Sequence, residues 1–117
     1  MIVNQDVGRQ LRKGVVEACI LGLLEHEAMY GWQLAEELIS RGKIIASIGT
    51  LYPVLSRLRD QELVTTFEQP SESGPSRRYY QITGKGQQEL EDFRGVWQQF
   101  TSDISALLNP KQGDTQT

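Results

Sequence analysis

Apolar residues recur every three to four positions in four stretches of the chain, approximately residues 11–25, 30–40, 47–62 and 84–108. This spacing places the apolar side chains of each stretch on one face of an α-helix. Between the third and fourth stretches, residues 63–68 and 77–82 are rich in β-branched and aromatic side chains, as is typical of strands. The pattern therefore predicts three short helices, a β-hairpin and one long helix.

The third predicted helix separates its apolar and polar positions cleanly. Ile48, Leu51, Leu55 and Leu58 form the stripe that we expect to be buried, and Ser47 precedes them as a candidate N-cap. The opposite face carries small, hydroxyl or basic side chains, with Tyr52 on its flank: Gly49, Thr50, Pro53, Ser56 and Arg57. Such a face is either solvated or able to approach another polar surface closely.

The region after the third helix predicts a β-hairpin. Residues 69–76 hold two prolines and a glycine and are expected to form its tip, and the returning strand begins with Arg77 and Arg78. Three helices followed by a hairpin describe a winged helix-turn-helix, in which the third helix enters the major groove of DNA and the hairpin lies along the neighbouring backbone. We therefore expect a mainly α fold with a small β-hairpin (α+β class), with the winged helix-turn-helix spanning residues 9–83.

The long C-terminal helix carries a regular apolar seam. Thr83 can cap its first turn, and six apolar residues follow at alternating spacings of three and four: Leu90, Phe93, Trp97, Phe100, Ile104 and Leu107. This a/d pattern is typical of a helix that pairs with another helix. We predict that residues 84–108 form a homodimer interface; the alternative is that the seam packs on the first helix of its own chain. The polar residues 109–117 are expected to be a disordered tail.

Composition indicates an ordinary single domain with an uneven charge distribution. The 117 residues carry a formal net charge of −3, but residues 1–88 hold ten basic and ten acidic side chains, so the excess lies in residues 89–117. An acidic chain can still present a local basic surface. No apolar run is long enough to span a membrane, and the first residues do not resemble a signal peptide. We therefore expect a cytoplasmic protein without a membrane partner.

Catalytic and metal-binding chemistry has little support in the sequence, and we expect neither enzyme activity nor a cofactor. His26, the one histidine, lies between Glu25 and Glu27 and is expected at the surface. The single cysteine, Cys19, cannot form an intrachain disulfide and lies in an apolar run, where a thiol is usually a small buried hydrophobe. One histidine and one cysteine cannot supply the four ligands of a structural zinc site, and residues 84–86 lack the spacing of a phosphate-binding loop.

Three segments of the chain resemble the PadR family of bacterial transcriptional regulators. They are Tyr-Gly-Trp-Gln-Leu at residues 30–34, Gly-Thr-Leu-Tyr-Pro-Val-Leu-Ser-Arg-Leu at residues 49–58 and Arg-Arg-Tyr-Tyr-Gln-Ile-Thr at residues 77–83. The resemblance extends over roughly residues 10–108 and is fairly specific when the segments occur in this order. It implies a winged-helix dimer that represses transcription and is released by a small effector, of the short subfamily with one helix after the wing.

The resemblance, together with the basic and hydroxyl side chains on the same predicted surface, suggests which residues bind double-stranded operator DNA. They are Arg12, Lys13, Ser47, Thr50, Tyr52, Ser56, Arg57, Arg77 and Arg78. In some family members an aromatic residue of the C-terminal helix lines a pore at the dimer interface that admits planar hydrophobic compounds. Trp97 stands at the matching position, flanked by Phe93 and Phe100. The alternative is that Trp97 only fills the seam.

The chain departs from the family pattern at two positions near the end of the third helix. Glu62 stands where a glycine usually ends that helix in a left-handed conformation. This conformation costs a non-glycine residue about 1 kcal/mol, which favours a different helix end here. Arg59 replaces a frequent glutamate and either adds a phosphate contact or pairs with Asp60 or Glu62. The acidic charge balance leaves one competing class, a winged helix that binds proteins and not DNA.

Overall fold

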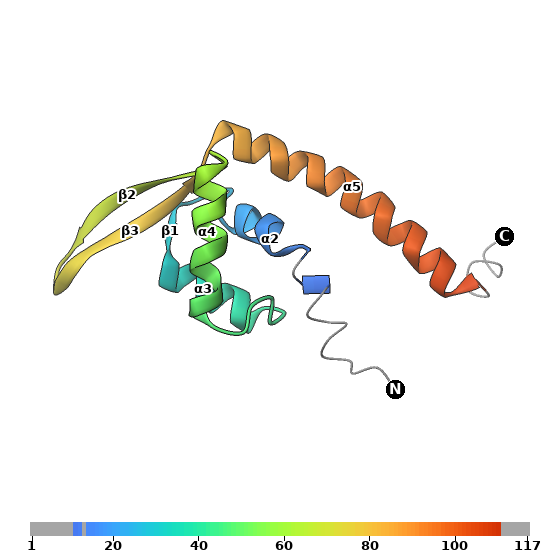
Figure 1. Cartoon of the computed structure of the whole chain (residues 1–117), viewed down its shortest axis with the longest axis horizontal. Coiled ribbons are helices and arrows are strands. Elements are labelled where there is room, and N and C mark those ends of the chain that lie inside the picture. The colour runs from blue at the N-terminus through green and yellow to red at the C-terminus, as the bar shows by residue number, and fades with distance from the viewer. Residues whose placement is uncertain (1–10, 13, 111–117) are drawn as a thin grey trace.

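The computed structural model describes residues 11–12 and 14–110 and shows helices packed on a sheet, with a hairpin and a long helix extending from them (Figure 1). The elements are α2 (Val16–Leu23), β1 (Met29–Tyr30), α3 (Gly31–Ser40), the 3-10 helix η1 (Ile48–Thr50), α4 (Leu51–Asp60), β2 (Val64–Ser71), β3 (Gly74–Ile82) and α5 (Gly84–Leu108). The strands form an antiparallel sheet in the order β1-β3-β2. The predicted α+β winged-helix fold is confirmed.

The core lies where α2, α3 and α4 meet the sheet. The predicted stripe is confirmed, because Leu51, Leu55 and Leu58 are fully buried and Ile48 packs against the core. Burying one such side chain stabilises a fold by about 1.5–3 kcal/mol. The other core residues are Val16, Ile20, Leu21, Leu24, Leu34, Ala35, Leu38, Ile45, Leu63, Val64, Tyr80 and Leu90. The buried stripe fixes the rotation of α4, so its polar face points outward.

The first helix is shorter than its apolar pattern predicts. A continuous helix over residues 11–25 is wrong, because the chain turns at Gly14 and Val15 and α2 begins only at Val16. In this turn the Val15 N–H donates to the Arg12 carbonyl oxygen at 3.0 Å. Glycine disfavours a helix because it loses more backbone entropy than other residues, which explains a break at this position.

α3 buries one narrow stripe. Leu34, Ala35 and Leu38 are buried, whereas Trp32 and Ile39 are 57% and 38% exposed. A helix that packs on one side buries only the residues of that face.

β1 is a strand that was not predicted from the sequence. Its two residues, Met29 and Tyr30, pair with Tyr80 and Tyr79 of β3. The predicted hairpin is therefore part of a three-stranded sheet.

The tip of the hairpin is much shorter than expected. β2 runs to Ser71 and β3 starts at Gly74, so only residues 72–73 form the turn, and the predicted tip over residues 69–76 is wrong. The pairing is irregular between Gln69 and Ser71, at Pro70. Proline lacks an N–H but is tolerated on an edge strand or at a bulge, and β2 is an edge strand. The wing is therefore a long two-stranded ribbon.

α4 ends in a left-handed residue although that residue is not glycine. Glu62 has φ 64°. Its N–H donates to the Arg59 carbonyl oxygen at 2.9 Å, and the Leu63 N–H donates to the Leu58 carbonyl oxygen at 2.9 Å. These two bonds are those of a Schellman motif. The expectation of a different helix end is wrong, because two satisfied carbonyl groups offset the strain at Glu62.

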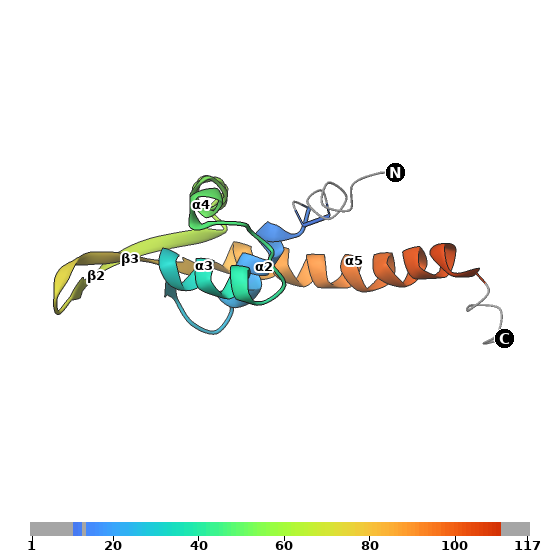
Figure 2. The same cartoon turned by 90° about the horizontal axis from the view of Figure 1, so that it is seen from below.

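α5 has the predicted bounds and the predicted cap. Thr83 Oγ1 accepts a hydrogen bond from the Gly86 N–H at 3.0 Å. The N-terminal part of α5 lies beside α2, and the rest of α5 runs away from the other helices (Figure 2). Most of the predicted tail, residues 111–117, lies outside the described residues. None of the described helices has the length and apolar content needed to cross a membrane.

Candidate nucleic-acid interface

The outward face of η1 and α4 carries the hydroxyl and basic side chains predicted there. Thr50, Tyr52, Ser56 and Arg57 are exposed. Ser47 is also exposed, but its hydroxyl does not cap the helix, which corrects the expected N-cap. Instead, the Thr50 hydroxyl donates to the Ser47 carbonyl oxygen at 2.8 Å. The face offers hydroxyl oxygens and a guanidinium, which are groups that bond to base edges and phosphate oxygens.

The ring of Tyr52 lies against the first residue of α3. A methyl group added at Gly31 would lie 2.7 Å from Tyr52 Oη and 3.1 Å from two of its ring carbons. The lack of a side chain at Gly31 therefore leaves space for this ring. Tyr52 is 46% exposed. One side of the ring supports the packing of α3 against α4, while the rest is available to a partner molecule.

Arg57 is held by an acidic residue of α2. Its Nε donates to Glu17 Oε2 at 2.6 Å, and the side chains of Arg57 and Glu17 are 53% and 36% exposed. Glu17 is absent from the sequence-based predictions. The two residues are 40 positions apart, and the spacing within α2 contains no signal that marks Glu17 as a partner of α4.

The two wing arginines lie on opposite faces of β3, because successive residues of a strand point to opposite sides. Arg78 Nε donates to Glu68 Oε2 at 3.1 Å across the hairpin. This hydrogen bond is the main cause that raises the pKa of the Arg78 guanidinium. Arg77 lies over the ring of Tyr30, with its Cζ atom 4.6 Å from the ring centroid, in a cation–π contact. The two side chains therefore do not form the single basic patch that adjacent arginines suggest.

Arg77 stands beside a row of aromatic rings that crosses the sheet. Tyr30 packs edge-on against Tyr79, and Phe67 stacks on Tyr79, with centroids 5.4 Å apart in both pairs. The three rings come from β1, β3 and β2 in their order in the sheet. Cross-strand aromatic pairs stabilise a sheet by roughly 0.2–1 kcal/mol each. The row stiffens the base of the wing, and it could not be predicted without knowing that β1 pairs with β3.

The basic residues outside α4 and the wing are only partly described. Arg12 is exposed ahead of α2, and Lys13 lies outside the described residues. Arg59 is exposed on α4, two positions from Arg57.

The seam of α5 has one buried end and one exposed end. Leu90 belongs to the core, and the rings of Phe93 and Trp97 stack with centroids 5.7 Å apart. The later seam residues are exposed by the following fractions: Trp97 44%, Phe100 55%, Ile104 37% and Leu107 77%. The alternative expectation, that the seam packs on the first helix of its own chain, therefore fits only the end near Leu90. An apolar face left uncovered by the described part of its own chain is typical of an interaction site.

The single cysteine and the single histidine lie in different surroundings. Cys19 is half-buried against the core, and burial raises the pKa of its thiol, which disfavours the nucleophilic thiolate. His26 is exposed as expected, with its Nε2 atom 3.6 Å from a Glu25 carboxylate oxygen. Among the described residues, no three His, Cys, Asp or Glu side chains come close enough to hold a metal ion.

Solved structures of transcriptional regulators share this fold. The chain is similar to a PadR-like regulator of Bacillus cereus, with 37% identity and a TM-score of 0.77 over 85% of this chain and 96% of that one. A PadR-like transcription factor of Bacteroides fragilis is 34% identical, with a TM-score of 0.72 over 87% of this chain and 98% of that one. PadR of Bacillus subtilis, solved in complex with operator DNA, is 27% identical, with a TM-score of 0.61 over 68% of this chain and 46% of that one.

Comparisons of sequence alone agree with the structural similarity. An uncharacterised protein of Lysinibacillus sphaericus is 28% identical over 109 residues, which are 92% of this chain and 96% of that protein. The family model described as the transcriptional regulator PadR-like family matches residues 20–92, which is more than half of the chain. The matched residues include α3, α4 and both strands of the wing. The chain therefore belongs to the PadR-like family of transcriptional regulators.

Proposed function

We propose that this chain is a homodimeric transcriptional repressor that binds double-stranded operator DNA through α4 and the wing. The observation that carries the proposal is the exposed polar face of α4, which the three fully buried leucines hold in place. An α-helix fits the major groove, which is about 12 Å wide. The operator complex of the related Bacillus subtilis protein supports this function over the competing class, a winged helix that binds only proteins. Such a regulator would act in the cytoplasm, where the DNA is.

The proposed contacts divide into base reading and backbone positioning. Thr50 at the end of η1 and Ser56 and Arg57 on α4 reach base edges, with Tyr52 beside them. The remaining proposed residues contact the sugar–phosphate backbone: Arg12, Lys13, Ser47, Arg77 and Arg78. Base contacts carry sequence specificity, whereas backbone contacts set the register of the protein on the duplex. In this proposal, residues 9–83 bind DNA and residues 84–108 hold the dimer together.

Titration of DNA with two arginine variants tests the proposal. Arg57→Ala should weaken binding to a fragment carrying the protein's own promoter by roughly 1–3 kcal/mol. Arg78→Ala should weaken binding to promoter and random duplexes alike and reduce the salt slope by about one. Arg41→Ala is the control, because Arg41 is also exposed and paired with a glutamate but lies after α3. Affinities unchanged in both test variants would overturn the proposal.

The homodimer is proposed from the uncovered seam of α5. Phe100, Ile104 and Leu107 repeat at heptad spacing and are exposed. Two such seams facing each other would bury these side chains by knobs-into-holes packing. A dimer would also present two copies of α4, as expected for binding to two operator half-sites.

The effector is proposed to be a planar hydrophobic compound that binds between the paired helices against Trp97. Phe93 and Trp97 stack with their planes only 16° apart, and Phe100 is exposed one turn further along. Flat rings in this arrangement favour a flat aromatic ligand. Planar aromatic compounds should quench Trp97 fluorescence in a Trp32→Phe background, which removes the chain's other tryptophan, and should release promoter DNA. Compounds that do neither would favour the alternative in which Trp97 only fills the seam.

A further inference from the structure

We infer that Glu17 is a specificity-determining residue, which orients Arg57 so that the terminal amino groups of Arg57 read a guanine in the operator. This assignment rests on the proposed DNA-binding function and specifies it further. Glu17 is the second residue of α2, and its carboxylate reaches the outward face of α4.

The contact with Glu17 is made by Nε and leaves the two terminal amino groups of Arg57, Nη1 and Nη2, available to DNA. Arg57 Nε donates to Glu17 Oε2 at 2.6 Å, and Nε is the only guanidinium nitrogen of Arg57 with a hydrogen bond among the described residues. The guanidinium is planar and its donors form a rigid fork. Holding Nε therefore restricts the plane and direction of Nη1 and Nη2. A pair of such donors matches O6 and N7 of guanine in the major groove, which is the commonest specific contact of arginine.

The helix that carries Glu17 is held in place by the core. Its neighbour Val16 is 6% exposed, and Ile20 on the next turn of α2 is completely buried. A free arginine side chain loses rotamer entropy when it is ordered on binding. An ion pair anchored to a packed helix removes part of that freedom before DNA arrives, so orienting Arg57 costs less when it binds.

The wing contains a matched pair with a different expected role. Arg78 also donates from Nε to a glutamate, Glu68, but both side chains are 53% exposed and lie on the hairpin. A backbone contact by Arg78 would carry no sequence information. Glu68→Gln is therefore the control for removing one carboxylate beside a DNA-binding arginine.

The test measures how strongly the protein recognises one base, separately from its overall affinity for DNA. A preferred duplex is first selected from a random oligonucleotide library with the full-length protein. Each guanine is then replaced in turn by 7-deazaguanine, which lacks the N7 acceptor. For the unmodified protein, we expect one guanine in each half-site at which the replacement lowers affinity by roughly tenfold. In Glu17→Gln that penalty should fall to about threefold or less, with affinity for random duplexes equal or higher.

Two further variants complete the test. Arg57→Ala should remove the penalty at the same guanine, and adding Glu17→Gln to Arg57→Ala should change it no further. Glu68→Gln should keep the full penalty. A full penalty in Glu17→Gln, or no sensitive guanine in the unmodified protein, would show that the assignment of Glu17 is wrong while DNA binding stands. Failure of the unmodified protein to bind any duplex would instead overturn the proposed function.

Discussion

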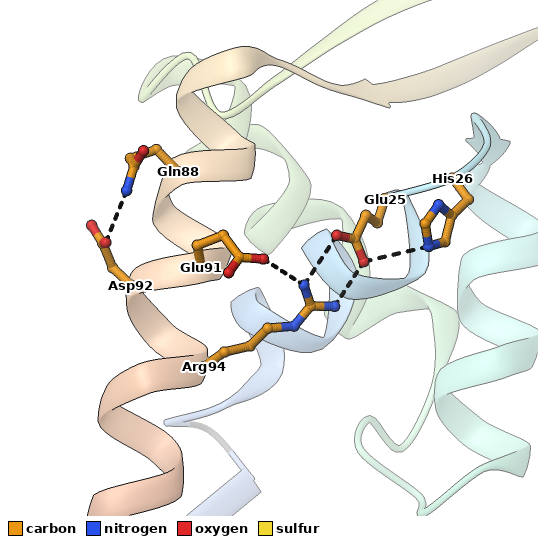
Figure 3. A network of polar contacts seen from close by, with 6 residues as sticks. All are labelled: Glu25, His26, Gln88, Glu91, Asp92 and Arg94. Carbon is orange, nitrogen blue, oxygen red and sulfur yellow. Dashed lines mark hydrogen bonds and ion pairs between the residues drawn. The ribbon is translucent and has the colours of Figure 1, made fainter.

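Arg94 of α5 donates hydrogen bonds to both carboxylate oxygens of Glu25, the residue that links α2 to the following loop (Figure 3). Arg94 Nη2 donates to Oε1 at 2.7 Å and Nη1 donates to Oε2 at 3.0 Å, and Glu91 accepts a third hydrogen bond from Nη1 at 2.9 Å. A bidentate arginine–carboxylate pair fixes orientation as well as adding energy. Among the described residues, no hydrogen bond or ion pair beyond residue 94 joins α5 to the other helices. The Arg94–Glu25 pair therefore helps to set the direction in which the seam is presented.

We expect the contribution of Glu25 to stability to disappear in acid. The hydrogen bond from Arg94 lowers the pKa of Glu25 below its ordinary value. A lowered pKa in the folded state gives stability that is present above the unfolded pKa of about 4.3 and is lost as pH falls through the folded pKa. The difference in Tm between the unmodified protein and Glu25→Gln should therefore be largest near neutral pH and shrink below about pH 4.

Thermal unfolding followed by circular dichroism from neutral to acidic pH checks this expectation. His26 and Glu91, which also belong to the network around Glu25 and Arg94, are kept in both proteins. Glu72→Gln is the control, because Glu72 is exposed in the turn of the hairpin. A Tm difference for Glu25→Gln that stays constant at all pH values would contradict the expectation.

Gly86→Ala should destabilise the fold, because at this residue α5 packs against Leu63, which directly precedes β2, and against Ile82 at the end of β3. A methyl group at Gly86 would overlap the Leu63 carbonyl oxygen and lie 2.8 Å from Ile82 Cγ1. Overpacking of this kind lowers the free energy of unfolding by about 1–3 kcal/mol. Gly95→Ala in the same helix meets nothing within 4 Å and should raise that free energy by about 0.5–1 kcal/mol. Urea denaturation measures both, and equal effects would show that the close contact at Gly86 is absent.

Glu62→Gly should stabilise the protein. Glu62 has φ 64°, a conformation that glycine adopts without steric strain. Relieving this strain should raise the free energy of unfolding by up to about 1 kcal/mol. The matched control is Gln61→Gly, because Gln61 has φ −84° and gains nothing from glycine, so that variant should be neutral or less stable. The prediction fails if urea denaturation shows the two glycine variants to be equally stable.

Phe100→Asp combined with Leu107→Asp should convert the proposed dimer into a folded monomer. Both side chains are exposed in the single chain, so the changes should leave its core intact while placing charges in the proposed seam. Ser102→Asp is the control, because Ser102 lies on the opposite, polar side of the heptad pattern. Sedimentation velocity distinguishes the two states, and a dimer that persists in the double variant would place the interface elsewhere.

The periodic elements could be predicted from the sequence because their information is local. The spacing of Leu51, Leu55 and Leu58 specifies both the helix and its buried face, and so also the outward position of Thr50 and Ser56. The long seam and the cap at residue 83 predicted the bounds of α5 in the same way. β1 was missed because two residues are too few to show a period, and its strand exists only through pairing with β3.

The sequence by itself determined the winged-helix architecture, the outward face of α4 and the apolar seam of α5, since each depends on spacing within one element. Only the tertiary structure decided which groups hold the candidate arginines: Glu17 for Arg57, Glu68 for Arg78 and the Tyr30 ring for Arg77. Glu17 and Arg57 are 40 positions apart and come from different helices. Contacts of this kind depend on how the elements pack together. The spacing of residues within one element carries no information about that packing.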